Sequence, residues 1–121
     1  MSEQLDSLHH VAIVVDDIAK AIDWYKSEFK CEVAYQDATW GFLKFANAHL
    51  ALVLPGQHPA HVAFVSDKAT VHPGLKGHRD GTRSVYISDT AGNAVELMDP
   101  TSLLADIQLV VLASASIAIV A

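Results

Sequence analysis

The sequence predicts an α+β domain made of two βαβββ-type modules, which form a curved mixed β-sheet around a cavity. The first observation is a repeat: residues 8–15 (LHHVAIVV) and 59–65 (PAHVAFV) each place a histidine at the head of a run rich in β-branched residues. These histidines, His10 and His61, lie 51 positions apart, and a period of this length indicates repeated structural units. The second observation is that apolar residues recur at helical spacing after the first of these two runs but not after the second.

Module one, residues 6–56, begins with the first of these runs as a strand. Asp16 and Asp17 follow it and provide a helix N-cap and early negative charge, which favour the positive end of the helix dipole. Apolar residues then recur at helical spacing, which predicts an amphipathic helix over residues 17–29 with its apolar side on the sheet. That side comprises Ile18, Ala21, Ile22, Tyr25 and Phe29.

Three β-rich runs complete module one, and turn-like residues separate them. They are residues 32–35, 41–45 and 49–54, and Pro55 and Gly56 end the module. The predicted order is therefore β-α-β-β-β.

Module two, residues 58–100, departs from this order after its first strand. The segment 66–74 is too short for a full helix and ends in Pro73 and Gly74, so the crossover helix should be reduced or missing. The rest is predicted as a loop at 76–82, a strand at 83–88, a tight turn at 89–93 and a last strand at 94–98.

Composition narrows the functional class. The chain of 121 residues is 51% hydrophobic and 18% charged, which is typical of one packed globular domain. A net charge of −6 with no basic cluster argues against nucleic acid as a partner, and a neutral or cationic small ligand suits it better. The single cysteine, Cys31, and the absence of signal-peptide features at the start of the sequence predict a cytoplasmic protein.

The last segment, residues 101–121, changes in composition and is almost wholly apolar after Asp106 and Gln108. It is too short and too interrupted for a membrane-spanning helix, so no stable membrane insertion is expected. An exposed apolar tail tends to associate, and we expect it to pack on the domain or on a partner subunit. The reduced second helix would leave part of the sheet uncovered, which favours a homodimer.

Two histidines at equivalent places in the two modules should meet where the sheets join. Glu96, on the last predicted strand, could complete a set of two histidines and one carboxylate, which binds divalent metals. Because neighbouring residues on a strand point to opposite faces, His10 should face the site, on the same side as Ala12. His9 should lie on the other face, either at the surface or as a residue that supports the site from outside the ligand set.

The chain resembles the vicinal oxygen chelate superfamily, which includes glyoxalase I, bleomycin-resistance proteins, fosfomycin-resistance enzymes and extradiol dioxygenases. The resemblance covers roughly residues 6–100 and rests on LHHVAIVVDDIAKAIDWYKSEF, HVAF and GHRDGTRSVYISDTAGNAVEL. It implies metal ligands at His10, His61 and Glu96. A further ligand position would fall within residues 51–53, which are all apolar here. This departure argues against glyoxalase I itself and leaves a three-ligand site for Fe, Mn, Zn or Ni.

The function that this resemblance implies is that of a metal-dependent enzyme, a lyase, isomerase or dioxygenase that chelates vicinal oxygens of a small substrate. Tyr86 and Arg83 are candidate substrate-binding residues, each with an ordinary structural role as the alternative. No catalytic base is assigned. The alternative function is a metal-free, drug-sequestering dimer of the bleomycin-resistance kind, with an aromatic or cationic ligand in its cavity.

Overall fold

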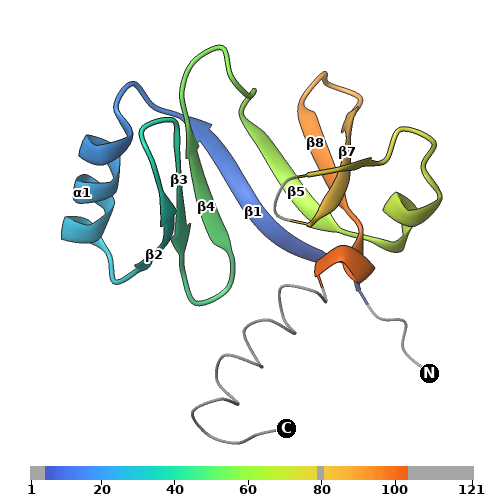
Figure 1. Ribbon diagram of the computed structural model, residues 1–121, viewed down its shortest axis with the longest axis horizontal. Helices are drawn as coiled ribbons and strands as arrows, with labels where there is room; N and C mark the ends of the chain where they lie inside the picture. Colours follow the sequence, from blue (N-terminus) through green and yellow to red (C-terminus); the bar gives the residue numbers. More distant parts are fainter. Residues whose placement is uncertain (1–4, 79–80, 104–121) are drawn as a thin grey trace, which may run out of the picture.

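The computed structural model describes residues 5–78 and 81–103, in which eight strands form one curved mixed sheet (Figure 1). The strand order across the sheet is β2-β3-β4-β1-β5-β8-β7-β6. The elements along the chain are β1 (Ser7–Val14), α1 (Ile18–Glu28), β2 (Glu32–Gln36), β3 (Trp40–Lys44), β4 (His49–Val53), β5 (His61–Val65), η1 (Asp67–Val71), β6 (Lys76–Gly77), β7 (Arg83–Ser88) and β8 (Ala94–Met98). The predicted α+β class and curved mixed sheet are confirmed.

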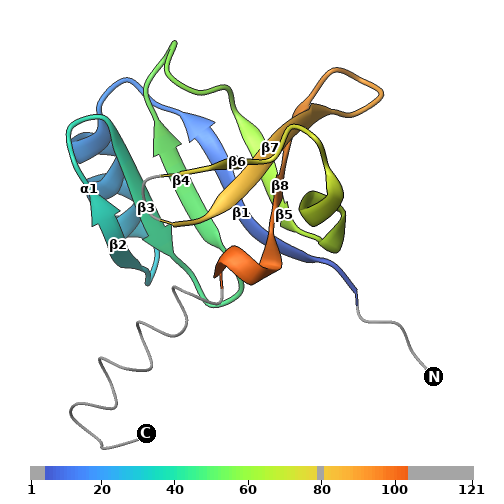
Figure 2. The same cartoon turned by 45° about the vertical axis from the view of Figure 1, so that its right-hand side comes forward.

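The two halves of the sheet repeat one pattern of strand pairing. In each half the first strand pairs in parallel with the last long strand, β1 with β4 and β5 with β8. The halves join where β1 and β5 pair antiparallel at the centre of the sheet, as both views show (Figure 2). The repeat seen in the sequence therefore corresponds to a structural repeat.

Helix α1 covers one face of the first half. Asp17 caps it by accepting a hydrogen bond from the Lys20 backbone N–H at 3.0 Å, which satisfies a backbone donor that has no partner within the helix. Its apolar side forms a buried cluster with β3 and β4, made of Ile18, Ile22, Leu43 and Leu52. Phe29 was expected in this core but is 52% exposed, because the helix ends before it and Phe29 is the C-cap.

Gly41 allows α1 to approach β3 closely. A Cβ atom at this position would lie 2.8 Å from Cδ1 of Ile22 and 3.3 Å from Cγ2 of Ile18. Residue 41 therefore faces the helix, and the alternate residues Trp40 and Phe42 of β3 face the other way.

In the second half, the 3₁₀ helix η1 takes the place of a crossover helix, as the short segment 66–74 predicts. Ala69 of η1 is fully buried against Val85 and Leu97, so η1 and α1 lie on the same face of the sheet. We call the opposite face the inner face. One loop prediction was wrong in part, since residues 76–77 of the expected loop pair with β7 as the short strand β6.

Most of the predicted apolar segment lies outside the described residues, which end at Leu103 with a helical turn that begins at Pro100. Its packing thus stays a prediction. Within residues 5–78 and 81–103, no helix has both the length and the apolar character that a membrane span requires.

Candidate metal centre

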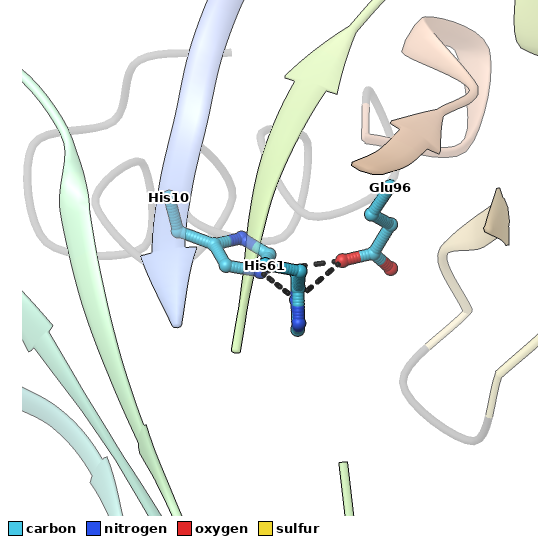
Figure 3. A group of neighbouring side chains, drawn as sticks. All are labelled: His10, His61 and Glu96. Carbon is cyan, nitrogen blue, oxygen red and sulfur yellow. Dashed lines mark hydrogen bonds and ion pairs between the residues drawn. The ribbon is translucent and has the colours of Figure 1, made fainter. Parts of the chain in front are cut away.

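Three side chains converge on the inner face from three adjacent strands: His10 from β1, His61 from β5 and Glu96 from β8 (Figure 3). Their exposed fractions are only 8%, 7% and 6%. The Nε2 atoms of the two histidines lie 3.2 Å apart. Oε1 of Glu96 lies 3.3 Å from Nε2 of His10 and 3.2 Å from Nε2 of His61. The structure thus brings together all three ligands expected from the sequence.

Strand register explains this convergence. Across the central pair of strands, Ala12 lies opposite His61 and His10 lies opposite Ala63. Ala63 also lies beside Glu96 in the next pair. The two alanines are 1% and 0% exposed, and their small side chains leave room in which the three longer side chains meet.

The spacing of the three ligand atoms fits a first-row divalent metal. Ligand atoms about 2.1 Å from such an ion are about 3.0 Å apart in octahedral geometry and about 3.4 Å apart in tetrahedral geometry. The observed separations of 3.2 to 3.3 Å fall between these values. One ion could therefore contact all three atoms and retain open positions.

The outer nitrogen of each imidazole already has a partner. Nδ1 of His61 donates to the carbonyl oxygen of Pro59 at 2.8 Å, so the neutral ring presents the lone pair of Nε2 toward the centre. Nδ1 of His10 lies 2.8 Å from Nδ1 of His9; when it donates there, Nε2 of His10 likewise faces the centre as an acceptor. Such partners orient metal-binding histidines and select their tautomer.

The second oxygen of Glu96 is held in the same way. The buried hydroxyl of Ser84 donates to Oε2 at 2.6 Å. Because that hydroxyl has one proton, the contact of 2.6 Å between Ser84 Oγ and His78 Nε2 is a hydrogen bond in which His78 donates. Oε2 is thereby occupied, which leaves Oε1 as the oxygen directed at the two histidines.

Glu96 and His61 each favour the charged form of the other. Burial opposes ionisation of Glu96, yet hydrogen bonds from the two histidines, which donate from Nε2 when the rings are protonated, and from Ser84 outweigh it and hold the pKa of Glu96 well below its usual value. Burial alone would lower the pKa of His61, but its bonds to Glu96 and to the Pro59 carbonyl, together with the Glu96 charge, raise that pKa. A metal ion would therefore displace a proton from the cluster as it binds.

Tyr86 lies beside the cluster, as the sequence suggested for a substrate-binding residue. It stands opposite Glu96 on the neighbouring strand, and its hydroxyl oxygen is 3.4 Å from Nε2 of His61. Burial and the Glu96 charge raise the pKa of Tyr86, so the phenol stays protonated. It can donate a hydrogen bond to a ligand oxygen.

Arg83, the other candidate for substrate binding, is not part of the cluster. Its guanidinium forms an ion pair with Asp99 and a 3.0 Å hydrogen bond to the Thr101 hydroxyl. Its neighbour Ser84 points to the inner face, so the alternation along β7 directs Arg83 to the other face. A role in substrate binding stays a prediction, without support from this arrangement.

His9 was expected to face away from the site, and this expectation was wrong. The pairing of β1 with β5 shifts register between Leu8 and His10, so His9 is the extra residue of a β-bulge. A bulge interrupts the alternation of side chains. The His9 ring consequently stacks on the His49 ring with a centroid separation of 5.6 Å, on the same side as His10.

The fold also assigns roles to residues that sequence reasoning left without one. Ser84, His78 and His49 were given no part in the site, yet the first two support Glu96 and the third stacks beside His9. Ser84 lies two residues before Tyr86 on one predicted strand, so both should face the same side of the sheet. This spacing was the signal that could have identified Ser84. His78 lies beyond a short loop, and no local pattern identifies its partner.

The expected fourth ligand position falls on Ala51. Ala12 lies opposite Ala51 in the first half, as Ala63 lies opposite Glu96 in the second. Ala51 is 4% exposed and has no side-chain atom that can bind a metal, so among residues 5–78 and 81–103 no protein ligand stands on this side of the cluster.

A family model matches residues 7–66, about half of the chain, and describes the Glyoxalase/Bleomycin resistance protein/Dioxygenase superfamily. The match spans β1, α1 and β5 and so includes His10 and His61, whereas Glu96 lies outside it. The chain belongs to this superfamily. No curated protein matched the chain in sequence.

Solved structures show the same fold at low sequence identity. A hypothetical protein from Bacillus halodurans is 13% identical, with a TM-score of 0.65 over 79% of this chain and 95% of that one. A methylmalonyl-CoA epimerase in complex with methylmalonyl-CoA and NH4⁺ is 16% identical, with a TM-score of 0.62 and the same coverage. Methylmalonyl-CoA epimerase from Mycobacterium tuberculosis is 18% identical, with a TM-score of 0.60 over 83% of this chain and 91% of that one.

Proposed function

We propose that His10, His61 and Glu96 bind one divalent metal ion, Fe, Mn, Zn or Ni, and that the protein is a metal-dependent enzyme of its superfamily. The reaction would be of the lyase, isomerase or dioxygenase type, on a small substrate with two neighbouring oxygens. The observation that carries the proposal is the convergence of three buried ligand atoms within 4.8 Å of one another.

A metal bound here would supply Lewis-acid catalysis, polarising substrate oxygens as negative charge develops on them. The chain's own residues prepare the site for this chemistry. Two neutral imidazoles and one carboxylate give the ligand set a single negative charge, so the ion keeps a net positive charge. The Ser84 bond to Oε2 favours ligation through one oxygen of Glu96, which leaves more positions for substrate.

Tyr86 is the residue best placed to contact the substrate. Its hydroxyl lies beside His61 and stays protonated, so it would donate a hydrogen bond to an oxygen that gains charge. Among residues 5–78 and 81–103, Glu96 is the carboxylate that reaches the two histidines. We assign no catalytic base.

Metal titration of the purified protein tests the proposal. We expect one equivalent of Zn²⁺ or Mn²⁺ to bind with a Kd at or below about 1 μM. His61→Ala should weaken binding at least ~100-fold, since it removes a proposed ligand together with the hydrogen bond to Pro59 that orients that ligand. His58→Ala is the matched control, because His58 is exposed and outside the cluster. Failure of the unaltered protein to bind either ion would refute the metal centre.

A second candidate function is metal-free binding of a small molecule, as in a drug-sequestering dimer. One observation favours it: a row of aromatic rings, including Trp40 and Phe42, lies on the inner face beside the cluster. Such a row can bind a ligand without a metal. This function predicts ligand affinity that does not change when metal is removed.

We also propose that the protein is a cytoplasmic homodimer. The five-residue η1 replaces the eleven-residue helix of the first half, and α1 leaves Trp24 54% and Phe29 52% exposed. Both features leave apolar surface that a second subunit would cover. Light scattering of the intact chain should give a dimeric mass, and a monomer at micromolar concentration would contradict this.

A further inference from the structure

The two halves of the inner face carry different chemistry at equivalent positions. Phe42 lies opposite Ala51 in the first half, as Tyr86 lies opposite Glu96 in the second. The second half therefore offers a carboxylate and a phenol hydroxyl, whereas the first offers a methyl group and a phenyl ring. The repeated fold thus has a polar half and an aromatic half, which meet at the two histidines.

The aromatic half is a continuous row of rings. Trp40 stacks on Tyr35 with centroids 4.8 Å apart and lies 5.5 Å from Phe42. Phe42 stacks on His49 at 4.5 Å with an angle of 5° between the ring planes. Phe42 also contacts the His10 ring edge to face, at 5.5 Å. The row therefore runs from the edge of the sheet to a metal-ligand candidate.

The side of the cluster that lacks a protein ligand is the side next to this row. Ala51 stands where the fourth ligand is expected, directly opposite Phe42. Ala12 lies beside Ala51 on β1 and is equally small. A ligand that reaches the metal from this side would have Phe42 as its neighbour.

The row is suited to a neutral flat group and poorly suited to a cation. Phe42 and His49 each use one face to stack on the other, so the stack presents its ring edges and its outer faces to a ligand. Ring edges carry the positive side of the quadrupole and attract the face of another ring, whereas cations prefer ring faces. Lys44 lies opposite His49 on the next strand, and its charge also disfavours a cation.

We propose that the substrate carries a flat aromatic ring next to its chelating oxygens, and that this ring packs against Trp40, Phe42 and His49. The inference rests on the proposed metal centre and adds the chemical class of the substrate. It predicts that an aromatic group binds at this position more tightly than a small aliphatic group.

Two hydroxamates test this subsite, because acetohydroxamate and benzohydroxamate have the same chelating oxygens and differ in the ring alone. Calorimetry on the Zn²⁺-loaded protein should show benzohydroxamate binding at least ~10-fold tighter, the order expected for burying a phenyl ring. In Phe42→Ala this preference should fall toward unity, with acetohydroxamate affinity unchanged. Phe42→Leu keeps a large apolar side chain and serves if Phe42→Ala does not fold. Trp24→Ala, on the outer surface of α1, is the control and should keep the preference.

The outcomes separate this inference from the metal centre. Equal affinity for the two hydroxamates would overturn the aromatic subsite while supporting the metal centre. If Zn²⁺ does not bind, the metal-free protein is titrated with benzamide. Binding that Phe42→Ala abolishes would then support the aromatic subsite and reject the metal-dependent function, and absence of binding would reject both.

Discussion

Ala51 of β4 occupies the position in the first half of the sheet that Glu96 of β8 occupies in the second. Ala51 lies beside Ala12, which comes two residues after His10. Glu96 lies beside Ala63, which comes two residues after His61. The backbone pairing is therefore the same in both halves, but the side chain at this position is a methyl group in one half and a carboxylate in the other. This asymmetry places the ligand-free side of the cluster, as far as the described residues go, next to the aromatic row.

Ala51→Glu should supply the missing ligand. A fourth ligand bond worth only ~1.4 kcal/mol would tighten Zn²⁺ binding tenfold, so we expect a gain of about tenfold or more by calorimetry. The same side chain would fill the open side and weaken acetohydroxamate binding. Ala46→Glu adds equal charge at an exposed turn and is the control. Unchanged Zn²⁺ affinity in Ala51→Glu would show that residue 51 does not face the ion.

Ser84→Ala should weaken metal binding by about tenfold, the lower end for loss of a group that orients a ligand. Without the Ser84 hydroxyl, Oε2 of Glu96 loses its 2.6 Å hydrogen bond and the carboxylate can rotate. Ser84→Thr keeps a hydroxyl and should restore most of the affinity. Ser88→Ala, on the same strand, is the control. Equal Kd values for Ser84→Ala and the unaltered protein would rule out this positioning role.

His9→Phe should weaken metal binding by a similar factor, because His9 orients the His10 ring. Phenylalanine can keep the stacking against His49 but cannot accept a hydrogen bond from Nδ1 of His10. We expect a loss of metal affinity of about tenfold, and partial recovery in His9→Asn, whose amide oxygen is an acceptor. If His9→Phe binds metal as well as the unaltered protein does, His9 contributes stacking alone.

The sequence was a good guide where a residue's role follows from local pattern. Strand β7 and strand β8 have the predicted bounds, and α1 differs from its prediction by one residue at each end. The convergence of His10 and His61 was predictable because a histidine recurs at the same place in both repeats, and Glu96 was expected beside them from its place on the last strand. The reduced crossover helix followed from Pro73 and Gly74, which end the segment after η1.

Long-range pairing accounts for what the sequence did not reveal. The bulge at His9 depends on the register between β1 and β5, and nothing in the LHHVAI stretch marks it. His78 reaches Ser84 across the β6–β7 turn, where the spacing carries no metal-ligand motif. Phe29 has the spacing of a core residue, but the backbone leaves the helix before it.

The pairing of Asp99 with Arg83 predicts how stability depends on pH. Asp99 is 1% exposed; burial opposes its ionisation, but hydrogen bonds from Thr101 and the nearby Arg83 lower its pKa below its ordinary value of 3.8. A carboxyl whose pKa is lower in the folded state stabilises the fold above its unfolded pKa and loses that effect as pH falls. Asp99→Asn should therefore reduce the free energy of unfolding by about 1–2 kcal/mol at pH 7.

This difference should shrink below pH 3.8 and nearly vanish once Asp99 is protonated in the folded protein, because the acid and the amide are then both neutral. Urea unfolding at pH 7, 5, 3 and 2 measures it. Asp16→Asn makes the same charge change at an exposed site and should have little effect at any of these values. A deficit in Asp99→Asn that stays constant from pH 7 to pH 2 would mean that the carboxylate charge does not stabilise the fold, and that hydrogen-bond geometry around Thr101 accounts for the loss instead.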